Sequence, residues 1–138
     1  MEQTKRYEFK LIIFEKVLDT FEKSLKVDLG KFSEIELDTF QNGQVQKFEY
    51  CVEICWKTIK SFLEDVHGLE SVSPKSAFKV FFQTGSIDEE TCESLFEMIN
   101  DRNRLSHIYE NDIFNEIYKK LPIYLEILKS ISTIIKNN

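Results

Sequence analysis

Glycine and proline are scarce in this chain, which has four glycines and two prolines among 138 residues. Proteins rich in β-turns use both residues often, so their scarcity favours helices, as do the many leucine, isoleucine, lysine and glutamate residues. No apolar run approaches the roughly 18 residues needed to span a bilayer, and the N-terminus carries charges at Glu2, Lys5 and Arg6. We therefore expect an all-α protein of the cytoplasm without a membrane segment.

Metal-binding and redox residues are also few. The three cysteines, Cys51, Cys55 and Cys92, form no C-x-x-C pair, and the two histidines are His67 and His107. Apolar neighbours surround Cys51 and Cys55, which indicates buried thiols. The sequence contains no glycine-rich phosphate loop, no metal-ligand cluster and no serine–histidine–aspartate set. It therefore predicts neither a metal nor a cofactor.

Acidic residues outnumber basic residues by 24 to 18, which gives a net charge of −6. A protein that binds nucleic acid non-specifically needs a large positive surface, because most of its affinity comes from phosphate contacts. The chain as a whole lacks such a surface, so any contact with RNA has to be local. Most charges alternate in sign along the chain, which is typical of solvated helix faces.

Apolar residues recur at alternating steps of three and four, the spacing of one face of an α-helix. One stripe lies within residues 7–25, and a second lies within a long helix from about Thr39 to Val66 that His67-Gly68 ends. The stripe residues are Leu11, Phe14, Leu18, Phe21 and Leu25 in the first helix, and Val45, Phe48, Val52, Cys55, Ile59, Phe62 and Val66 in the second.

Shorter signals complete the helical pattern. Ser73-Pro74 is a cap before a short crossover helix, and Ser86-Ile-Asp-Glu89 fits a capping box that opens the helix carrying Arg102. A last helix follows Asn111-Asp112, and we expect it to bend at Pro122, which cannot donate a backbone hydrogen bond.

These elements predict a single domain over residues 1–138, an up-and-down bundle of four long helices plus a short crossover helix. The second and last helices carry further apolar residues outside their main stripes, namely Ile54, Trp56, Ile113, Ile123 and Ile127. A dimer would bury this surface, so we expect a homodimer.

The densest group of functional side chains is Asp101-Arg-Asn-Arg-Leu-Ser-His-Ile-Tyr109. Arg102 is able to hold a phosphate bidentately, and His107 is able to move a proton near neutral pH. Phosphodiester cleavage needs a base for the ribose 2′-hydroxyl, a donor for the leaving oxygen and a cation beside the developing charge. The residue types in this segment therefore fit RNA cleavage.

The spacing within the segment sets a condition on this chemistry. Arg102 and His107 are five positions apart, about 140° around a regular helix, so they converge only if the helix ends between them or a second subunit contributes. A symmetric dimer would supply two of each side chain. Alternatively the segment is structural: Arg102 and Arg104 pair with neighbouring carboxylates, His107 interacts with the helix dipole, and Tyr109 packs.

The pattern of Arg102-Asn103, three residues, His107, one residue and Tyr109 resembles the arginine–four–histidine–any–tyrosine signature of the HEPN (higher eukaryotes and prokaryotes nucleotide-binding) superfamily. Gln46-Lys-Phe-Glu-Tyr-Cys-Val-Glu-Ile-Cys-Trp-Lys57 is similar to the second-helix pattern of its nucleotidyltransferase substrate-binding, or HepT-like, branch. Ser76-Ala77-Phe78 and Gly85-Ser86-Ile87 stand where that branch has its crossover helix and a glycine before an isoleucine. The resemblance covers nearly the whole chain.

The resemblance implies an α-helical homodimer encoded beside a minimal nucleotidyltransferase. Many relatives are toxin RNases whose motif histidine and arginine act at the dimer cleft, which assigns catalytic roles here to Arg102, Asn103 and His107. The resemblance also makes Tyr109 a candidate acceptor for nucleotidyl transfer by the partner enzyme, with Arg104 close to the added phosphate.

Glu49, Glu53 and Lys57 lie at four-residue steps on one helix face, beside Trp56. They form either a surface ion-pair network, worth about 0.3 kcal/mol per pair, or part of the cleft or dimer interface.

These observations together predict a HEPN-type toxin of a toxin–antitoxin pair. It would be a metal-independent RNase that acts on RNA at a dimer cleft and is neutralised by the nucleotidyltransferase. Two alternatives remain open. One is a non-catalytic substrate-binding or docking subunit of a two-component nucleotidyltransferase, and the other is a structural helical dimer module.

Overall fold

The computed structural model describes residues 4–107 and 111–138. Every element within these residues is helical, and none of the helices is long and apolar enough to cross a membrane. The α-helices are α1 (Arg6–Leu25), α2 (Glu34–Phe62), α3 (Pro74–Gln83), α4 (Glu89–Arg104), α5 (Asn111–Tyr118) and α6 (Leu121–Lys136). A π-helical turn, Leu63–His67, extends α2, and a 3-10 turn, Leu105–His107, follows α4. The prediction of an all-α bundle is confirmed.

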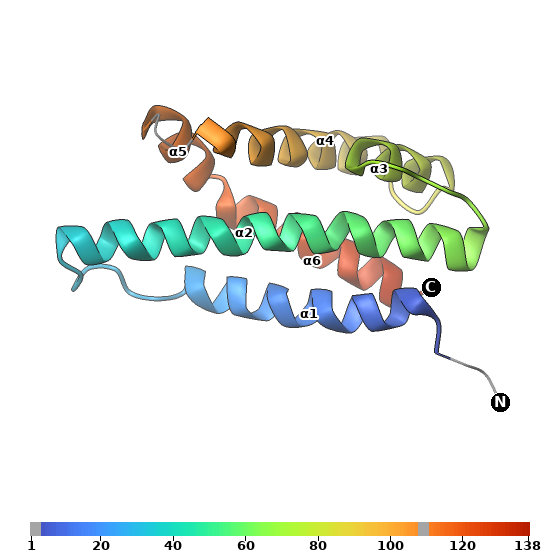
Figure 1. Ribbon diagram of the computed structural model, residues 1–138, viewed down its shortest axis with the longest axis horizontal. Helices are drawn as coiled ribbons and strands as arrows, with labels where there is room; N and C mark the ends of the chain where they lie inside the picture. Colours follow the sequence, from blue (N-terminus) through green and yellow to red (C-terminus); the bar gives the residue numbers. More distant parts are fainter. Residues whose placement is uncertain (1–3, 108–110) are drawn as a thin grey trace.

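Helix α2 runs the length of the molecule, and the other long helices pack around it (Figure 1). Its 29 residues span about 44 Å at 1.5 Å per residue. Helix α1 lies antiparallel along one side of α2, α3 and α4 lie along the other side, and α6 crosses behind it. The start of α1 and the end of α6 lie toward one end of the long axis, and α5 lies at the other.

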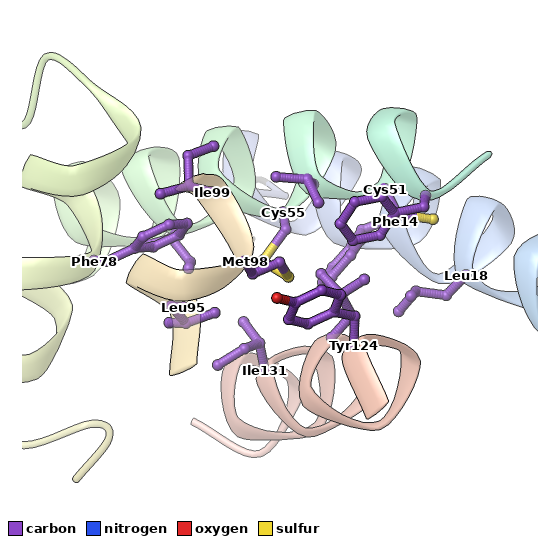
Figure 2. Close-up of a cluster of buried hydrophobic side chains, with 14 of the residues drawn as sticks. Phe14, Leu18, Cys51, Cys55, Phe78, Leu95, Met98, Ile99, Tyr124 and Ile131 are labelled. Carbon is purple, nitrogen blue, oxygen red and sulfur yellow. The ribbon is translucent and has the colours of Figure 1, made fainter. Parts of the chain in front are cut away.

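The core fills the space between α2 and the helices around it. Phe48 of α2 is fully buried, stacks on Tyr124 of α6 at a centroid distance of 5.3 Å, and lies 6.2 Å from the ring of Phe21 in α1. Figure 2 shows how side chains of α1, α2, α4 and α6 gather around Tyr124. The predicted stripes face this core, except that Leu25 is half-buried and Val66 is exposed at their C-terminal ends.

All three cysteines are buried and unpaired, as the sequence predicted. Burial raises the pKa of the Cys51 thiol to about 12, despite the opposing charge of Lys47. Burial also raises the pKa of Cys55 and of Cys92. The thiols are therefore protonated at neutral pH and serve as small apolar side chains.

Helix α2 begins at Glu34 and not near Thr39, so the predicted start was wrong. Ser33 and Glu36 form a reciprocal capping box: Ser33 Oγ accepts from the Glu36 N–H at 3.3 Å, and Glu36 Oε1 accepts from the Ser33 N–H at 2.9 Å. The apolar stripe starts only later in the helix, which is why periodicity placed the start too late. At the other end Gly68 adopts a left-handed φ of 67° and terminates the helical run, as predicted.

The predicted capping box at Ser86 was also wrong. Asp88 is the N-cap of α4, and its carboxylate accepts from the Thr91 N–H at 2.8 Å. The Ser86 hydroxyl instead lies 2.7 Å from that of Thr84. An aspartate is as good a cap as a serine, and its charge is favourable at the positive end of the helix dipole.

The last helix is divided into α5 and α6 and does not bend as one piece. Helix α5 ends at Tyr118, Lys119 and Lys120 form a turn, and Pro122 occupies the first turn of α6. A proline is tolerated there because the first N–H groups of a helix have no partner within it.

The apolar residues expected at a dimer interface are only partly accessible in one chain. Ile54, Trp56, Ile113 and Ile127 pack half-buried against the core, whereas Ile123 is 62% exposed. The apolar surface that these residues offer to a second copy is therefore smaller than the sequence indicated.

Candidate functional site

Helix α4 carries three of the predicted site residues, Arg102, Asn103 and Arg104, in its last turn. It is followed by the 3-10 turn, whose first residue, Leu105, is buried in the core. The α-helix thus ends between Arg102 and His107, which is the condition that their spacing set. The side chain of His107 and the whole of Tyr109 lie outside the described residues.

The guanidinium of Arg102 lies against α2. Its Nη2 atom is 3.5 Å from Oε2 of Glu53. The Trp56 indole donates a hydrogen bond to the same oxygen at 3.1 Å, and Lys57 Nζ lies 3.1 Å from the other oxygen, Oε1. The two motifs that carry the HEPN resemblance therefore meet in one group of side chains, Arg102, Glu53, Trp56 and Lys57, called the Arg102 cluster below.

Electrostatics keep the carboxylate of the cluster charged. Burial alone would raise the pKa of Glu53, but hydrogen bonds from Lys57 and Trp56 and the charges of Lys57 and Arg102 outweigh it and lower that pKa. Glu49, one turn earlier on α2, behaves differently, because burial raises its pKa and the charge of Arg102 only partly offsets the effect. No hydrogen bond or ion pair joins Glu49 to another described residue.

The described residues leave one buried donor of Arg102 without an acceptor. Its Nε atom has no hydrogen-bond partner among the described residues, although the side chain as a whole is 35% exposed. Leaving a buried N–H unpaired costs about 1–3 kcal/mol. Among the described residues, the ion pair with Glu53 is the contact that joins this guanidinium to α2.

Arg104, two residues further on, faces different elements. It donates to Asp101 Oδ1 at 3.1 Å and to Glu116 Oε2 of α5 at 2.6 Å. The structure does not bring Arg104 into the Arg102 cluster. The structural alternative for this arginine, pairing with a neighbouring carboxylate, is therefore what the chain adopts. Asn103, between the two arginines, is exposed.

Sequence reasoning missed the buried network around Asp101. This residue is 3% exposed, and its carboxylate accepts hydrogen bonds from the Tyr124 hydroxyl, from Lys120 Nζ at 3.1 Å and from Arg104. Burial would raise the pKa of Asp101, but the bonds from Tyr124, Lys120 and Arg104 outweigh it and lower that pKa. Only the pairing with Arg104, three residues away, had a signal in the sequence.

An apolar hollow lies elsewhere. It has a volume of about 450 Å³, is lined by the end of α1 and the first turns of α2, and includes Phe32, Phe40 and Gly43. None of the predicted site residues lines it. The described residues also contain no group of three or more histidine, cysteine, aspartate or glutamate side chains placed to hold a metal ion.

Residues 9–137 match the family model described as nucleotidyltransferase substrate binding protein like. The chain belongs to this family, which confirms the HEPN-like branch that its two motifs indicated. A comparison with curated proteins gives no match.

Several solved structures are similar over nearly their full length. A protein of Thermus thermophilus has a TM-score of 0.77 at 25% identity, over 88% of this chain and 98% of its own. The tri-AMPylated Shewanella oneidensis HEPN toxin, solved in complex with MNT antitoxin, has a TM-score of 0.75 at 17% identity, over 99% and 100%. A toxin–antitoxin MntA–HpeT mutant has a TM-score of 0.75 at 15% identity, over 96% and 98%. The last two are toxin–antitoxin proteins by name, and at these identities they establish a shared fold.

Proposed function

We propose that this protein is the toxin of a toxin–antitoxin pair, a metal-independent RNase that acts in the cytoplasm as a homodimer. The observation that carries the proposal is the Arg102 cluster, in which the arginine of the HEPN signature lies against the glutamate, tryptophan and lysine of the second motif. The Arg102 side chain is 35% exposed, which supports the proposal that its guanidinium binds a phosphodiester.

In the proposed reaction His107 takes the proton from a ribose 2′-hydroxyl, and the 2′-oxygen attacks the adjacent phosphorus. The bond from phosphorus to the 5′-oxygen breaks, a cyclic 2′,3′-phosphate forms, and the leaving oxygen accepts a proton. Arg102 binds the phosphate and stabilises the charge that develops on it, and Asn103 positions either group. The second proton-transfer group is the His107 of the other subunit, because a symmetric cleft contains two.

The catalytic proposal is tested by His107→Ala in purified protein that is free of its partner and unmodified. Cleavage of RNA should fall by about 10²-fold or more, as expected when a proton-transfer group is removed. His67→Ala is the matched control, since His67 lies at the end of the α2 extension and packs on Phe62. It should leave cleavage unchanged. RNA left intact by the wild-type protein would refute the RNase activity.

A second function, the non-catalytic docking subunit, is favoured by the description of the family as substrate-binding for nucleotidyltransferases. The same pair of variants separates it from the first. A docking subunit cleaves no RNA and keeps its affinity for the nucleotidyltransferase when His107 is replaced, whereas an RNase loses cleavage.

We further propose that the partner, a minimal nucleotidyltransferase encoded nearby, neutralises the toxin by transferring nucleotides to Tyr109. The relative described as a tri-AMPylated toxin in complex with its antitoxin supports this assignment. Each phosphodiester would add about one negative charge close to Arg102, and the guanidinium would bind the adduct in place of RNA.

Intact-mass spectrometry after co-expression with that enzyme tests the acceptor. Wild type should gain one or more nucleoside monophosphates, and Tyr109→Phe should gain none. Tyr50→Phe is the control, because Tyr50 is a 53% exposed tyrosine on α2 and should not be the acceptor. An adduct that persists in Tyr109→Phe would reject the assignment and leave the RNase proposal intact.

A further inference from the structure

We propose that Glu53 is a positioning residue for Arg102: its carboxylate, held by Trp56 and Lys57, fixes the guanidinium where it meets the phosphodiester. The inference rests on the proposed function and adds to it a role for the second motif. Glu53 touches neither substrate nor reacting atoms, so its effect passes through the arginine.

An unrestrained arginine suits this task poorly. Its long side chain has many rotamers, and ordering it at the moment of binding costs conformational entropy. Arg102 stands in the last turn of α4, where it has no ion-pair partner on its own helix among the described residues. The contact with Glu53 on α2 restricts it beforehand, which is how preorganised sites gain affinity and rate.

The geometry of the contact leaves the arginine available. The separation of 3.5 Å between Nη2 and Oε2 is that of an ion pair and is longer than a strong charge-assisted hydrogen bond. A guanidinium has five N–H donors, and Glu53 faces only one of its ends. Arg102 is therefore held by Glu53 and still presents donors to a phosphate.

The carboxylate that holds the arginine is itself held. Both of its oxygens are engaged, Oε2 by the Trp56 indole and Oε1 by Lys57, from positions three and four residues further along α2. These contacts also lower the pKa of Glu53, so the carboxylate stays charged through the neutral range. A carboxylate without these contacts would move together with the arginine and would not fix the position of the guanidinium.

Glu22 is a structural control for Glu53, because its contacts involve none of the proposed site residues. Glu22 of α1 accepts from Lys129 of α6 at 2.8 Å and has Lys26 four residues later on its own helix, at 3.9 Å. Like Glu53, it joins two helices and is partly exposed, at 26% against 32%. Glu22→Gln therefore removes an interhelical ion pair in which Arg102 takes no part.

The test is a double-mutant cycle of Glu53→Gln and Arg102→Ala, with Glu22→Gln as the control. In wild-type background Glu53→Gln should lower kcat/KM for RNA by about tenfold, and in the Arg102→Ala background it should change kcat/KM by less than about twofold. Glu22→Gln should keep the wild-type value. Equal losses in both backgrounds, or a similar loss in Glu22→Gln, would mean that Glu53 has a general structural role and would overturn the proposal.

A binding cycle on the same variants separates this inference from the proposed function. The probe is a 2′-O-methyl oligoribonucleotide, which cannot be cleaved, and the readout is its fluorescence anisotropy. Glu53→Gln should weaken binding several-fold only when Arg102 is present. If the wild-type protein binds the probe but cleaves no RNA, the RNase proposal fails while this cycle still decides the role of Glu53. Additive effects on binding would overturn the positioning role alone.

Trp56 gives an independent check that the cluster has changed as intended. It is the single tryptophan of the chain, and its indole N–H binds Glu53. Its emission should shift in Glu53→Gln and stay unchanged in Glu22→Gln. An unchanged emission in both variants would show that the indole does not hold Glu53, and would reject that part of the proposal.

Discussion

At the scale of single residues, two carboxylates that contact the arginines of the last turn of α4 have different tasks. Glu53 is half-exposed and faces one guanidinium that has spare donors, whereas Asp101 is buried and accepts from three separate side chains. The donors to Asp101 come from α4, from α6 and from the turn before α6. Asp101 therefore ties together the elements from which the candidate site extends.

We predict that Asp101→Asn lowers the free energy of unfolding at neutral pH by about 2 kcal/mol, because Tyr124, Lys120 and Arg104 would then donate to a buried neutral amide in place of a charged carboxylate. Urea denaturation followed by circular dichroism measures the change. Asp19→Asn is the control, since Asp19 forms an exposed i, i+4 pair with Lys23 and should give no measurable change. Equal stability of Asp101→Asn and wild type would contradict the role of the network.

The same variant should alter the dependence of stability on pH. The pKa of Asp101 is lower in the folded chain than in the unfolded chain, so its contribution is present above the unfolded value of about 3.9 and is lost as the pH falls below it. The stability difference between wild type and Asp101→Asn should be largest near neutral pH and should shrink below about pH 4.

At the scale of elements, the helices form where apolar spacing placed them, and their ends are set by other groups. Ser33 and Asp88 begin α2 and α4 through side-chain oxygens that accept from backbone N–H groups. Serines and aspartates near each start are able to cap the helix, so the spacing of apolar residues does not predict which of them is the N-cap.

We predict that Ser33→Ala destabilises the protein by about 1 kcal/mol, since it removes the acceptor for a backbone N–H in the first turn of α2. Thermal or urea unfolding measures the loss. Ser130→Ala is the matched control, because Ser130 lies within α6 with its hydroxyl bonded to the Ile127 carbonyl, and alanine is the better helix former there. A control as destabilised as Ser33→Ala would argue against the cap.

Some features of the candidate site were predicted from the sequence and others were not. The motif residues Arg102 and Glu53 were both named from the sequence, and their residue types predicted phosphate binding and an ion pair. Their pairing with one another was not predicted, because it depends on how α2 and α4 pack. The long-range bonds of Lys120 and Tyr124 to Asp101 were missed for the same reason.

At the scale of the whole molecule, a single chain supplies one copy of each proposed catalytic residue, Arg102, Asn103 and His107. A symmetric dimer would double the set, and its interface would cover apolar side chains that remain accessible. Ile123 at 62% and Tyr50 at 53% are two of the large side chains that the single chain leaves exposed. Part of the surface available to a dimer is thus apolar.

We predict that the protein is a homodimer at micromolar concentration. Light scattering after size exclusion should give about twice the chain mass of 16.4 kDa. Ile123→Asp should shift the protein toward the monomer if α6 contributes to the interface, whereas Val72→Asp, at an 87% exposed position in the connection before α3, should not. A monomeric wild type would remove the second histidine from the proposed cleft.

The start of α1 and the end of α6 lie toward the end of the long axis opposite α5, which suggests a covalent form of that dimer (Figure 1). A flexible linker from Asn138 of one copy to the N-terminus of a second would leave α5 and the last turn of α4 without a covalent attachment. In such a tandem chain each copy can be mutated separately. A chain with His107→Ala in one half and Arg102→Ala in the other would reveal whether the two halves of a cleft complement one another in trans.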